Sequence, residues 1–168
     1  EAFEQLQTGR PRPVEIEIPP ETLSDIANVE LLEAGIYERP VGSKESIERG
    51  SELISNAKNP LIWAGGGVIS SEASKELTEL AEYLQAPVIT TGEGRGAITD
   101  RHYLSIGSFR FKHDTFFDSE IDNYDLVVAV GTRMAFPQYL KGQKVLQIDI
   151  DDEEIGRNYD NTEGINGD

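Results

Sequence analysis

The sequence contains no cysteine, and only two of its 168 residues are histidines, His102 and His113. Without thiols there can be no disulfide framework, no thiolate metal site and no cysteine nucleophile. Neither histidine has a second histidine or a carboxylate at the spacing of a zinc site, so we expect no metal ligands here. The sequence also has no recognisable Ser/His/Asp grouping, no acid/base carboxylate pair and no P-loop lysine. We therefore expect a binding scaffold without catalytic residues.

Positive charge is scarce, with 15 Lys and Arg against 31 Asp and Glu and a formal net charge of -16. A field of this sign repels phosphate backbones and anionic lipid headgroups, so nucleic acid and membrane surfaces are not expected partners. Long apolar runs are lacking too. None approaches the ~20 residues that span a bilayer, and no signal segment opens the sequence. These absences predict a soluble, cytoplasmic protein.

The first 42 residues carry little regular pattern. A helix end closed by Gly9 precedes VEIEI at Val14 to Ile18, whose alternation predicts a strand. Residues 21–42 are acidic, contain prolines and have no sustained period, which is typical of a linker. We place a domain boundary near residues 38–43. Both ends of the sequence look cut, so we expect a piece of a longer polypeptide.

From Ser43 onward helical and strand patterns alternate. Ser43 is a good helix N-cap, and further helices are expected at residues 72–84 and 113–122. Five strands are predicted, with a sixth beginning in GINGD at the end; the five are residues 61–64, 87–90, 103–106, 125–130 and 144–150. The last two lack alternation, as parallel strands covered on both faces do. The fold class is thus α/β, a doubly wound, mostly parallel, five- to six-stranded Rossmann-like sheet with helices on both faces.

Four loops are expected beyond the carboxyl ends of these strands, where open parallel sheets bind ligands. They are residues 65–71, 91–97, 107–113 and 131–136. Glycines in them suit both a phosphate cradle and a tight turn, and several such loops at one edge favour the ligand. The nicotinamide fingerprint fits badly, because Ser70 replaces its third glycine and Thr90-Thr91 replace the acidic residue after the second strand. A dehydrogenase is therefore a weak interpretation.

The charges near these loops leave alternatives open. Residues 94–113 contain one acidic residue and a basic patch of four residues, Arg95, Arg101, Arg110 and Lys112. The basic patch either attracts a phosphate or is an ordinary solvated face. Arg133 is the sharper phosphate candidate, but it could instead pair with Asp149 or Asp151. Asp149 could accept hydrogen bonds from a ribose or adenine, whereas Asp151 or Asp152 is more simply a helix N-cap. Magnesium binding at these carboxylates is not expected.

The segment AKNPLIWAGGGVISSEASKELTELAEYLQAPVITTGEGRGAI, with DLVVAVGTRM and KVLQIDIDDEEIGRN, resembles the central domain of thiamine diphosphate-dependent enzymes. That group holds acetolactate synthase, pyruvate oxidase, benzoylformate decarboxylase and glyoxylate carboligase. The opening TGRPRPVEIEIPPE is similar to the close of the preceding pyrimidine-binding domain. The resemblance implies that residues 1–20 end that domain, residues 21–42 are an interdomain linker and residues 43–168 form the central Rossmann-like domain.

In this family the central domain holds FAD, ADP or nothing. The resemblance implies these cofactor-binding positions: Gly65, Gly66, Gly67, Thr90, Thr91, Gly92, Gly131, Thr132, Arg133, Asp149 and Ile150. Two departures weigh against flavin, namely Gly107-Ser108-Phe109-Arg110 where the family usually has a GMHG-like loop, and Gly92-Glu93 where an apolar pair is common.

The resemblance also implies a parent enzyme, a transferase or lyase that acts as a 2-oxo acid carboligase or decarboxylase. Thiamine diphosphate and magnesium would bind in the parent but not in this fragment, which lacks the activating glutamate and the GDG…N motif. The expected partners are the flanking domains, in a homo-oligomer. The alternative is a free-standing FAD- or NAD-binding module of the electron-transfer flavoprotein or transhydrogenase type.

Overall fold

The structure is a computed structural model that describes residues 2–33, 35–108, 119–135 and 139–168. Its chain divides into two compact units, Glu1–Arg39 and Pro40–Asp168. The first unit holds two short helices, α1 (Ala2–Gln7) and α2 (Pro20–Ser24), and none of its described residues is buried. Val14 to Ile18 do not form the predicted strand. A strand needs a hydrogen-bonded neighbour, and the described part of this unit offers no second strand to pair with.

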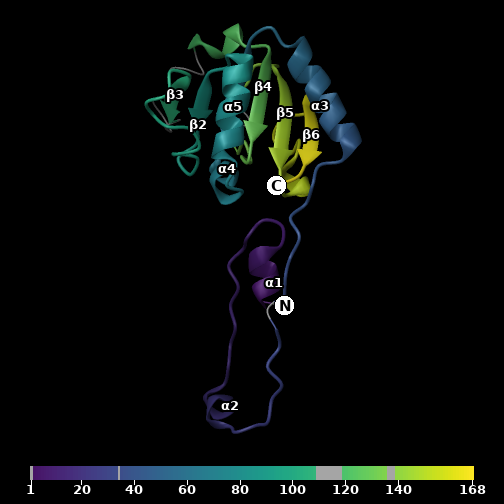
Figure 1. Ribbon diagram of the computed structural model, residues 1–168, viewed down its shortest axis with the longest axis vertical. Coiled ribbons are helices and arrows are strands. Elements are labelled where there is room, and N and C mark those ends of the chain that lie inside the picture. The colour runs from purple at the N-terminus through teal and green to yellow at the C-terminus, as the bar shows by residue number, and fades with distance from the viewer. Residues whose placement is uncertain (1, 34, 109–118, 136–138) are drawn as a thin grey trace. The chain divides into compact units, whose positions relative to one another are not determined.

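The second unit is built on one six-stranded sheet in which every neighbouring pair is parallel (Figure 1). The strands are β1 (Pro60–Ala64), β2 (Val88–Thr90), β3 (Ser105–Ser108), β4 (Leu126–Val130), β5 (Lys144–Asp149) and β6 (Thr162–Asn166). Their order is β3-β2-β1-β4-β5-β6. The chain therefore builds outward from β1 to one edge, returns to β4 and builds to the other edge, which confirms the doubly wound α/β fold class.

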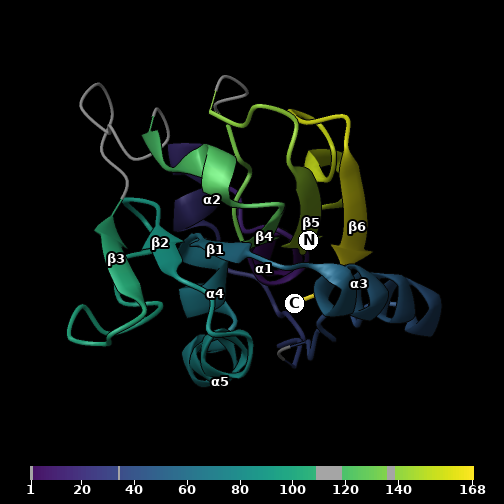
Figure 2. The ribbon, with the colours of Figure 1, turned by 90° about the horizontal axis from the view of Figure 1, so that it is seen from above.

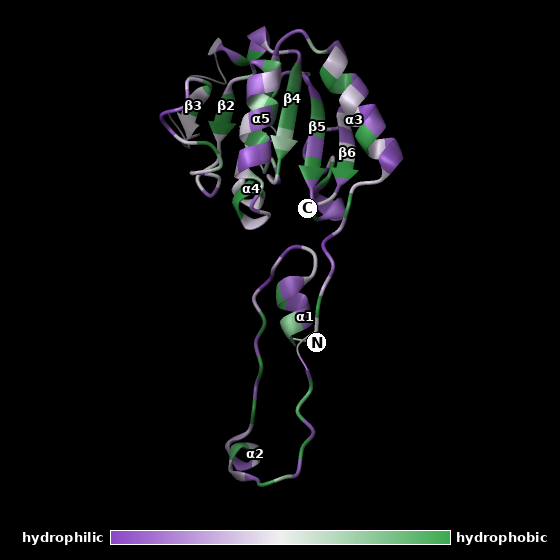
Figure 3. Ribbon diagram, in the orientation of Figure 1, coloured by the Kyte–Doolittle hydropathy of each residue, from purple (hydrophilic) through white to green (hydrophobic). Residues whose placement is uncertain are grey.

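The central strands form because their side chains are apolar on both faces. All five residues of β1 are buried, as are four of the five in β4. Figure 3 shows β4 as mostly hydrophobic, whereas α3 and α5 carry hydrophilic and hydrophobic residues in turn. This is the pattern of parallel strands enclosed by amphipathic elements.

Two helices follow the predicted boundaries closely. Helix α3 (Lys44–Asn56) begins after Ser43, whose hydroxyl accepts a hydrogen bond from the Ser46 amide at 3.1 Å. Helix α5 (Ser74–Leu84) ends at the predicted residue, where Gln85 adopts a left-handed conformation with φ of 51°. It begins two residues later than predicted, because a short helix, α4 (Gly66–Ser70), and a turn at Glu72 precede it.

Two apolar clusters enclose the sheet. The larger joins one face to α3, α4 and α5 through Ile54, Val68 and Leu77 among others, and Figure 2 shows all three helices on that face. The other face is covered by loops and by short turns such as η1 (Ile121–Asn123), with Trp63 and Met134 in its cluster. Part of the predicted helix at 113–122 lies outside the described residues.

Two strands differ slightly from prediction. Strand β3 lies two residues further along than expected, and β6 begins at Thr162, two residues before GINGD. Such boundary shifts are expected, because strand ends are set by which backbone groups find partners in the neighbouring strand.

Candidate functional site

The described parts of the four predicted loops lie at the carboxyl edge of the sheet. The first loop follows β1 with Gly65, the N-cap of α4. Its amides are already used inside the protein: Gly65 N donates to Val130 O at 2.8 Å, Gly67 N to Gly131 O at 3.0 Å, and Val68 N to Gly65 O at 3.3 Å. Three amides of the glycine loop are thus unavailable to a phosphate in this conformation.

The fourth loop is packed directly onto the first. Gly131 has φ of +58°, and a Cβ atom on it would lie 2.6 Å from the Gly67 Cα and 2.7 Å from the Val68 amide nitrogen. A Cβ on Gly67 would in turn lie 2.6 Å from the Gly131 Cα. Glycine is needed at both positions so that the two backbones can approach each other.

The second loop covers the first from another side. The Thr91 amide donates to Ala64 O at 2.8 Å, and the Gly94 amide donates to the Thr91 hydroxyl at 3.0 Å. A Cβ on Gly66 would meet the Glu93 Cβ at 3.2 Å and the Glu93 carbonyl oxygen at 3.4 Å. The start of α4 therefore faces the backbone of Glu93, whose side chain is exposed.

The third loop is only partly described. The Thr90 hydroxyl donates to Gly107 O at 3.4 Å, and the Ser108 hydroxyl donates to Thr91 O at 3.3 Å, which ties the end of β3 to the second loop. Three predicted residues of the basic patch or its border lie outside the described residues: Arg110, Lys112 and His113. Arg95 and Arg101 are described and exposed.

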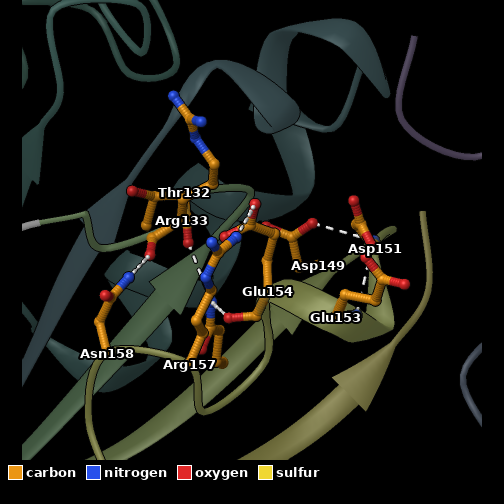
Figure 4. A network of polar contacts seen from close by, with 9 residues as sticks. Thr132, Arg133, Asp149, Asp151, Glu153, Glu154, Arg157 and Asn158 are labelled. Carbon is orange, nitrogen blue, oxygen red and sulfur yellow. Dashed lines mark hydrogen bonds and ion pairs between the residues drawn. The ribbon is translucent and has the colours of Figure 1, made fainter. Parts of the chain in front are cut away.

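Arg133 follows β4 and is exposed. Its carbonyl accepts a hydrogen bond from Asn158 Nδ2 at 3.0 Å, while its guanidinium forms no ion pair with any residue in the described part of the chain. Figure 4 shows this side chain extending away from Asp149 and Asp151. The pairing of Arg133 with one of these carboxylates, left open by the sequence, is not formed here.

Gln147 anchors the loop that carries Arg133. This side chain is buried in the middle of β5, with 2% of its surface exposed. Its amide nitrogen donates to Thr132 O at 3.1 Å and to Glu154 O at 3.2 Å, and its amide oxygen accepts from the Gly156 amide at 3.0 Å. One side chain therefore joins the loop after β4 to the segment after β5 through three buried hydrogen bonds.

The acidic cluster after β5 serves mainly as local capping. Asp149 is buried, and its Oδ1 accepts a hydrogen bond from the Asp151 amide at 3.0 Å. Asp151 in turn caps η2 (Asp152–Glu154) through the Glu153 amide at 3.2 Å, as predicted for Asp151 or Asp152. Asn166 Nδ2 donates to Asp149 O at 3.3 Å and to Ile150 O at 3.0 Å. The predicted binding positions Asp149, at the end of β5, and Ile150, just after it, are thus both hydrogen-bonded within the protein.

This edge can be tested against the groups that the sequence suggested. Asp149 Oδ1 and the three glycine-loop amides already have partners in the protein, so the edge is not an open pyrophosphate cradle as it stands. The guanidinium of Arg133, which has no ion pair among the described residues, remains the group best suited to an anion. No group of three or more metal-ligating side chains exists among the described residues. The helices in the described ranges include none long and apolar enough to cross a membrane.

Sequence reasoning missed the polar residues that support this edge. They are Gln147, Glu154, Arg157, Asn158 and Asn166, of which Figure 4 labels Glu154, Arg157 and Asn158. Glu154 is nearly buried and pairs with Arg157 Nη1 at 3.2 Å. One signal was available, because a glutamine inside the apolar run KVLQIDI must find buried partners.

Comparison with known proteins identifies the family of this fold. Residues 47–168 match the model of the thiamine pyrophosphate enzyme central domain. The chain is 35% identical to an acetolactate synthase of Arthrospira platensis, with 100% of this chain and 32% of the relative covered. It is 33% identical to a glyoxylate carboligase of Escherichia coli O157:H7, over 94% of this chain and 28% of the relative.

A solved structure agrees in fold. Benzoylformate decarboxylase from Polynucleobacter necessarius superposes with a TM-score of 0.74 at 20% identity, over 89% of this chain and 29% of that chain. This chain therefore spans about a third or less of the length of the relatives it matches. The alternative of a free-standing flavin or nicotinamide module finds no support in these matches. From its motifs, its parallel sheet and these relatives, the chain belongs to the thiamine pyrophosphate enzymes, whose central domain its residues 47–168 form.

Proposed function

We propose that this chain is the scaffold domain of an acetolactate synthase-like enzyme that joins or decarboxylates 2-oxo acids. The observation that carries the proposal is the family match over residues 47–168, together with relatives named acetolactate synthase and glyoxylate carboligase. In this proposal, the described residues supply no catalytic group. At the carboxyl edge of the sheet the polar side chains hold the loops to one another instead of converging on a reacting atom.

In the parent enzyme, thiamine diphosphate and magnesium would be bound by other domains. When bound there, thiamine diphosphate would supply the electron sink that 2-oxo acid carboligation or decarboxylation needs. This chain would contribute a rigid body between those domains. The full enzyme would be a homo-oligomer. Residues 1–20 would complete the preceding pyrimidine-binding domain, and residues 21–42 would link it to the scaffold.

The test uses the full-length parent protein. Loaded with thiamine diphosphate and magnesium, it is expected to release carbon dioxide from a small 2-oxo acid such as glyoxylate and to form a condensed product. The chain 1–168 under the same conditions is expected to show no turnover. Turnover by the isolated chain would contradict the scaffold role, and a parent inactive on every 2-oxo acid tried would contradict the reaction class.

A second role, binding of FAD or ADP at the carboxyl edge, rests on Arg133. Its guanidinium is exposed and free of ion pairs with the described residues, and it lies beside the loop of Gly131 and Thr132. The occupied amides of the glycine loop oppose this role, so any phosphate would have to depend on the arginine fork. Thr90, Thr91, Gly92 and Ile150 stay predicted contacts of such a nucleotide.

Calorimetric titration of FAD and of ADP into chain 1–168 tests this second role. If the arginine holds the phosphate, Arg133→Ala should weaken binding by roughly tenfold or more, as expected for loss of a charge-assisted contact. Arg12→Ala is the matched control, because it removes an exposed arginine from the unit Glu1–Arg39, which contains none of the predicted binding positions. No heat with either ligand, or equal losses in the two variants, would remove the assignment to Arg133.

A further inference from the structure

One chemically labile pair lies at the end of β6. Asn166-Gly167 is the single Asn-Gly step in the sequence. Asparagine before glycine is prone to spontaneous deamidation, because the glycine nitrogen has no neighbouring side chain to hinder its attack. In such an attack the backbone nitrogen of Gly167 bonds to Asn166 Cγ, and Nδ2 leaves as ammonia. Water then opens the succinimide to aspartate or isoaspartate, so no other reactant is needed.

The fold holds both reacting groups in hydrogen bonds. Gly167 N donates to Asp149 O at 3.0 Å, which extends the pairing of β6 with β5 past Asn166. The Asn166 amide donates to Asp149 O at 3.3 Å and to Ile150 O at 3.0 Å. Attack would require the Gly167 amide to leave its acceptor and the Asn166 side chain to rotate away from both carbonyls.

The surroundings of Gly167 restrict this movement further. Gly167 is buried, and a Cβ atom on it would lie 2.9 Å from the Gly42 nitrogen. The next residue, Asp168, donates its amide to Pro40 O at 2.9 Å. The end of β6 is therefore held between β5 on one side and residues 40–42 on the other. The reaction must wait for local opening of β6.

The product would no longer fit this place. A carboxylate at position 166 has no proton to donate, so it would face the carbonyl oxygens of Asp149 and Ile150. The carboxylate of Asp149 is buried nearby, and Asp152 lines the same groove as Asn166, so the new charge would also meet like charges. Isoaspartate would in addition lengthen the backbone and break the β5–β6 register.

We infer that Asn166-Gly167 is a deamidation site whose reaction rate is controlled by the fold. The site is protected while β6 is paired with β5. Once Asn166 is deamidated, β6 cannot return to its original pairing, so an otherwise reversible opening becomes irreversible. This modification site is independent of the 2-oxo acid chemistry proposed above. Its argument needs only the contacts of Asn166, Gly167 and the ends of β5 and β6.

The test follows the mass gain at Asn166 and the isoaspartate content of chain 1–168 at mildly alkaline pH. Deamidation in the native chain should be at least about tenfold slower than in the same chain unfolded in urea, because it is limited by local opening. The urea sample should match a peptide of residues 162–168. Equal rates in native and unfolded chains would overturn the proposed protection.

Two pairs of variants test this protection and its consequence. Ile165→Ala loosens β6 on the core that includes Leu146 and should speed deamidation of the native chain, whereas Ile69→Ala, at a partly exposed site on α4, should not.

Asn166→Asp should lower the ratio of folded to unfolded protein by about tenfold, through lost hydrogen bonds and an unfavourable charge. Asn161→Asp, with a long 3.5 Å contact to Gln143 O, is its control. An unchanged urea midpoint in Asn166→Asp would contradict the irreversible opening.

Discussion

At the scale of single residues, Gln147 is the side chain on which the candidate site depends most. It is buried opposite Ala129 of β4 in the register of the sheet, and its amide bonds to the loop after β4 and to the segment after β5. Its place in KVLQIDI is visible in the sequence, but its partners are not. They lie 15, 7 and 9 residues away, so only the folded loops decide which groups it meets.

Replacing Gln147 with leucine should therefore be costly. The change keeps a similar volume but removes the partner of Thr132 O and Gly156 N, while Glu154 O keeps only the Arg157 amide at 3.4 Å. Since each unsatisfied buried group costs about 1–3 kcal/mol, we expect a loss of about 2 kcal/mol or more in the free energy of unfolding. Urea denaturation measures it. Gln5→Leu, at an exposed site, is the control and should stay within about 0.5 kcal/mol of the parent chain. A similar, small effect in both variants would contradict the anchoring role.

At the scale of elements, close contact between loops explains the triple glycine better than an open phosphate cradle does. The Gly65 amide donates to the last residue of β4 and the Gly67 amide to the loop after β4, and Gly131 fills the space that a side chain on Gly67 would need. The sequence predicts that these loops share an edge, because they follow parallel strands. It cannot say how near they come, since that depends on the stagger of β1 against β4.

Gly131→Ala should then separate the two loops. It combines a left-handed backbone, which costs a non-glycine residue about 1–2 kcal/mol, with a Cβ only 2.6 Å from the Gly67 Cα. We expect a loss of at least about 2 kcal/mol in urea denaturation. Gly92→Ala is the matched control on the second loop, because a Cβ there has nothing within 4 Å, and it should change stability by less than about 0.5 kcal/mol. If both alanines are tolerated equally, the packing argument fails.

A second element contact depends on pH. Asp125 precedes β4, and its carboxylate accepts hydrogen bonds from the Lys58 amide at 2.8 Å and the Asn59 amide at 2.9 Å, just ahead of β1. The bond from the Lys58 amide is the main cause that lowers the pKa of Asp125 below its ordinary 3.8, with partial burial opposing it and the Asn59 amide adding to it. The carboxylate thus ties the starts of two neighbouring strands together.

Asp125→Asn should weaken this tie by roughly 0.5–1 kcal/mol, a small value because the group is exposed. Because the folded-state pKa is lowered, the contribution is complete above pH 3.8 and is lost as pH falls through the lower folded-state pKa. The difference between variant and parent, measured by urea denaturation across pH, should therefore shrink in acid. Asp122→Asn, which removes an exposed ion pair with Lys141, is the control. A difference that grows in acid would contradict the assigned cause.

At the scale of the whole molecule, the two units differ in what holds them together. Both apolar clusters belong to Pro40–Asp168, while large side chains such as Phe3, Ile26 and Ile36 in Glu1–Arg39 are mostly exposed. Hydrophobic burial is the main force that stabilises a fold, so the second unit carries nearly all of the stability.

Residues 40–168 should therefore fold without residues 1–39. We expect the shortened chain to unfold cooperatively, with a thermal midpoint within a few degrees of that of chain 1–168, because no buried side chain is removed. Circular dichroism during heating measures it. A broad transition or a much lower midpoint would show that the first unit supports the core after all.

Local patterns in the sequence by themselves determined the α/β class, the helix start at Ser43, the buried strands and the edge where the loops gather, because each depends on residues close together in the chain. The order of the motifs from Ala57 to Asn158 also indicated the family. Tertiary structure alone decided that Val14 to Ile18 stay unpaired, that Gln147 holds the loop of Arg133, and that the amides of the glycine loop are already bonded within the protein. These outcomes depend on hydrogen-bond partners far apart in sequence, and a pattern of residue types cannot specify which distant group fills each one.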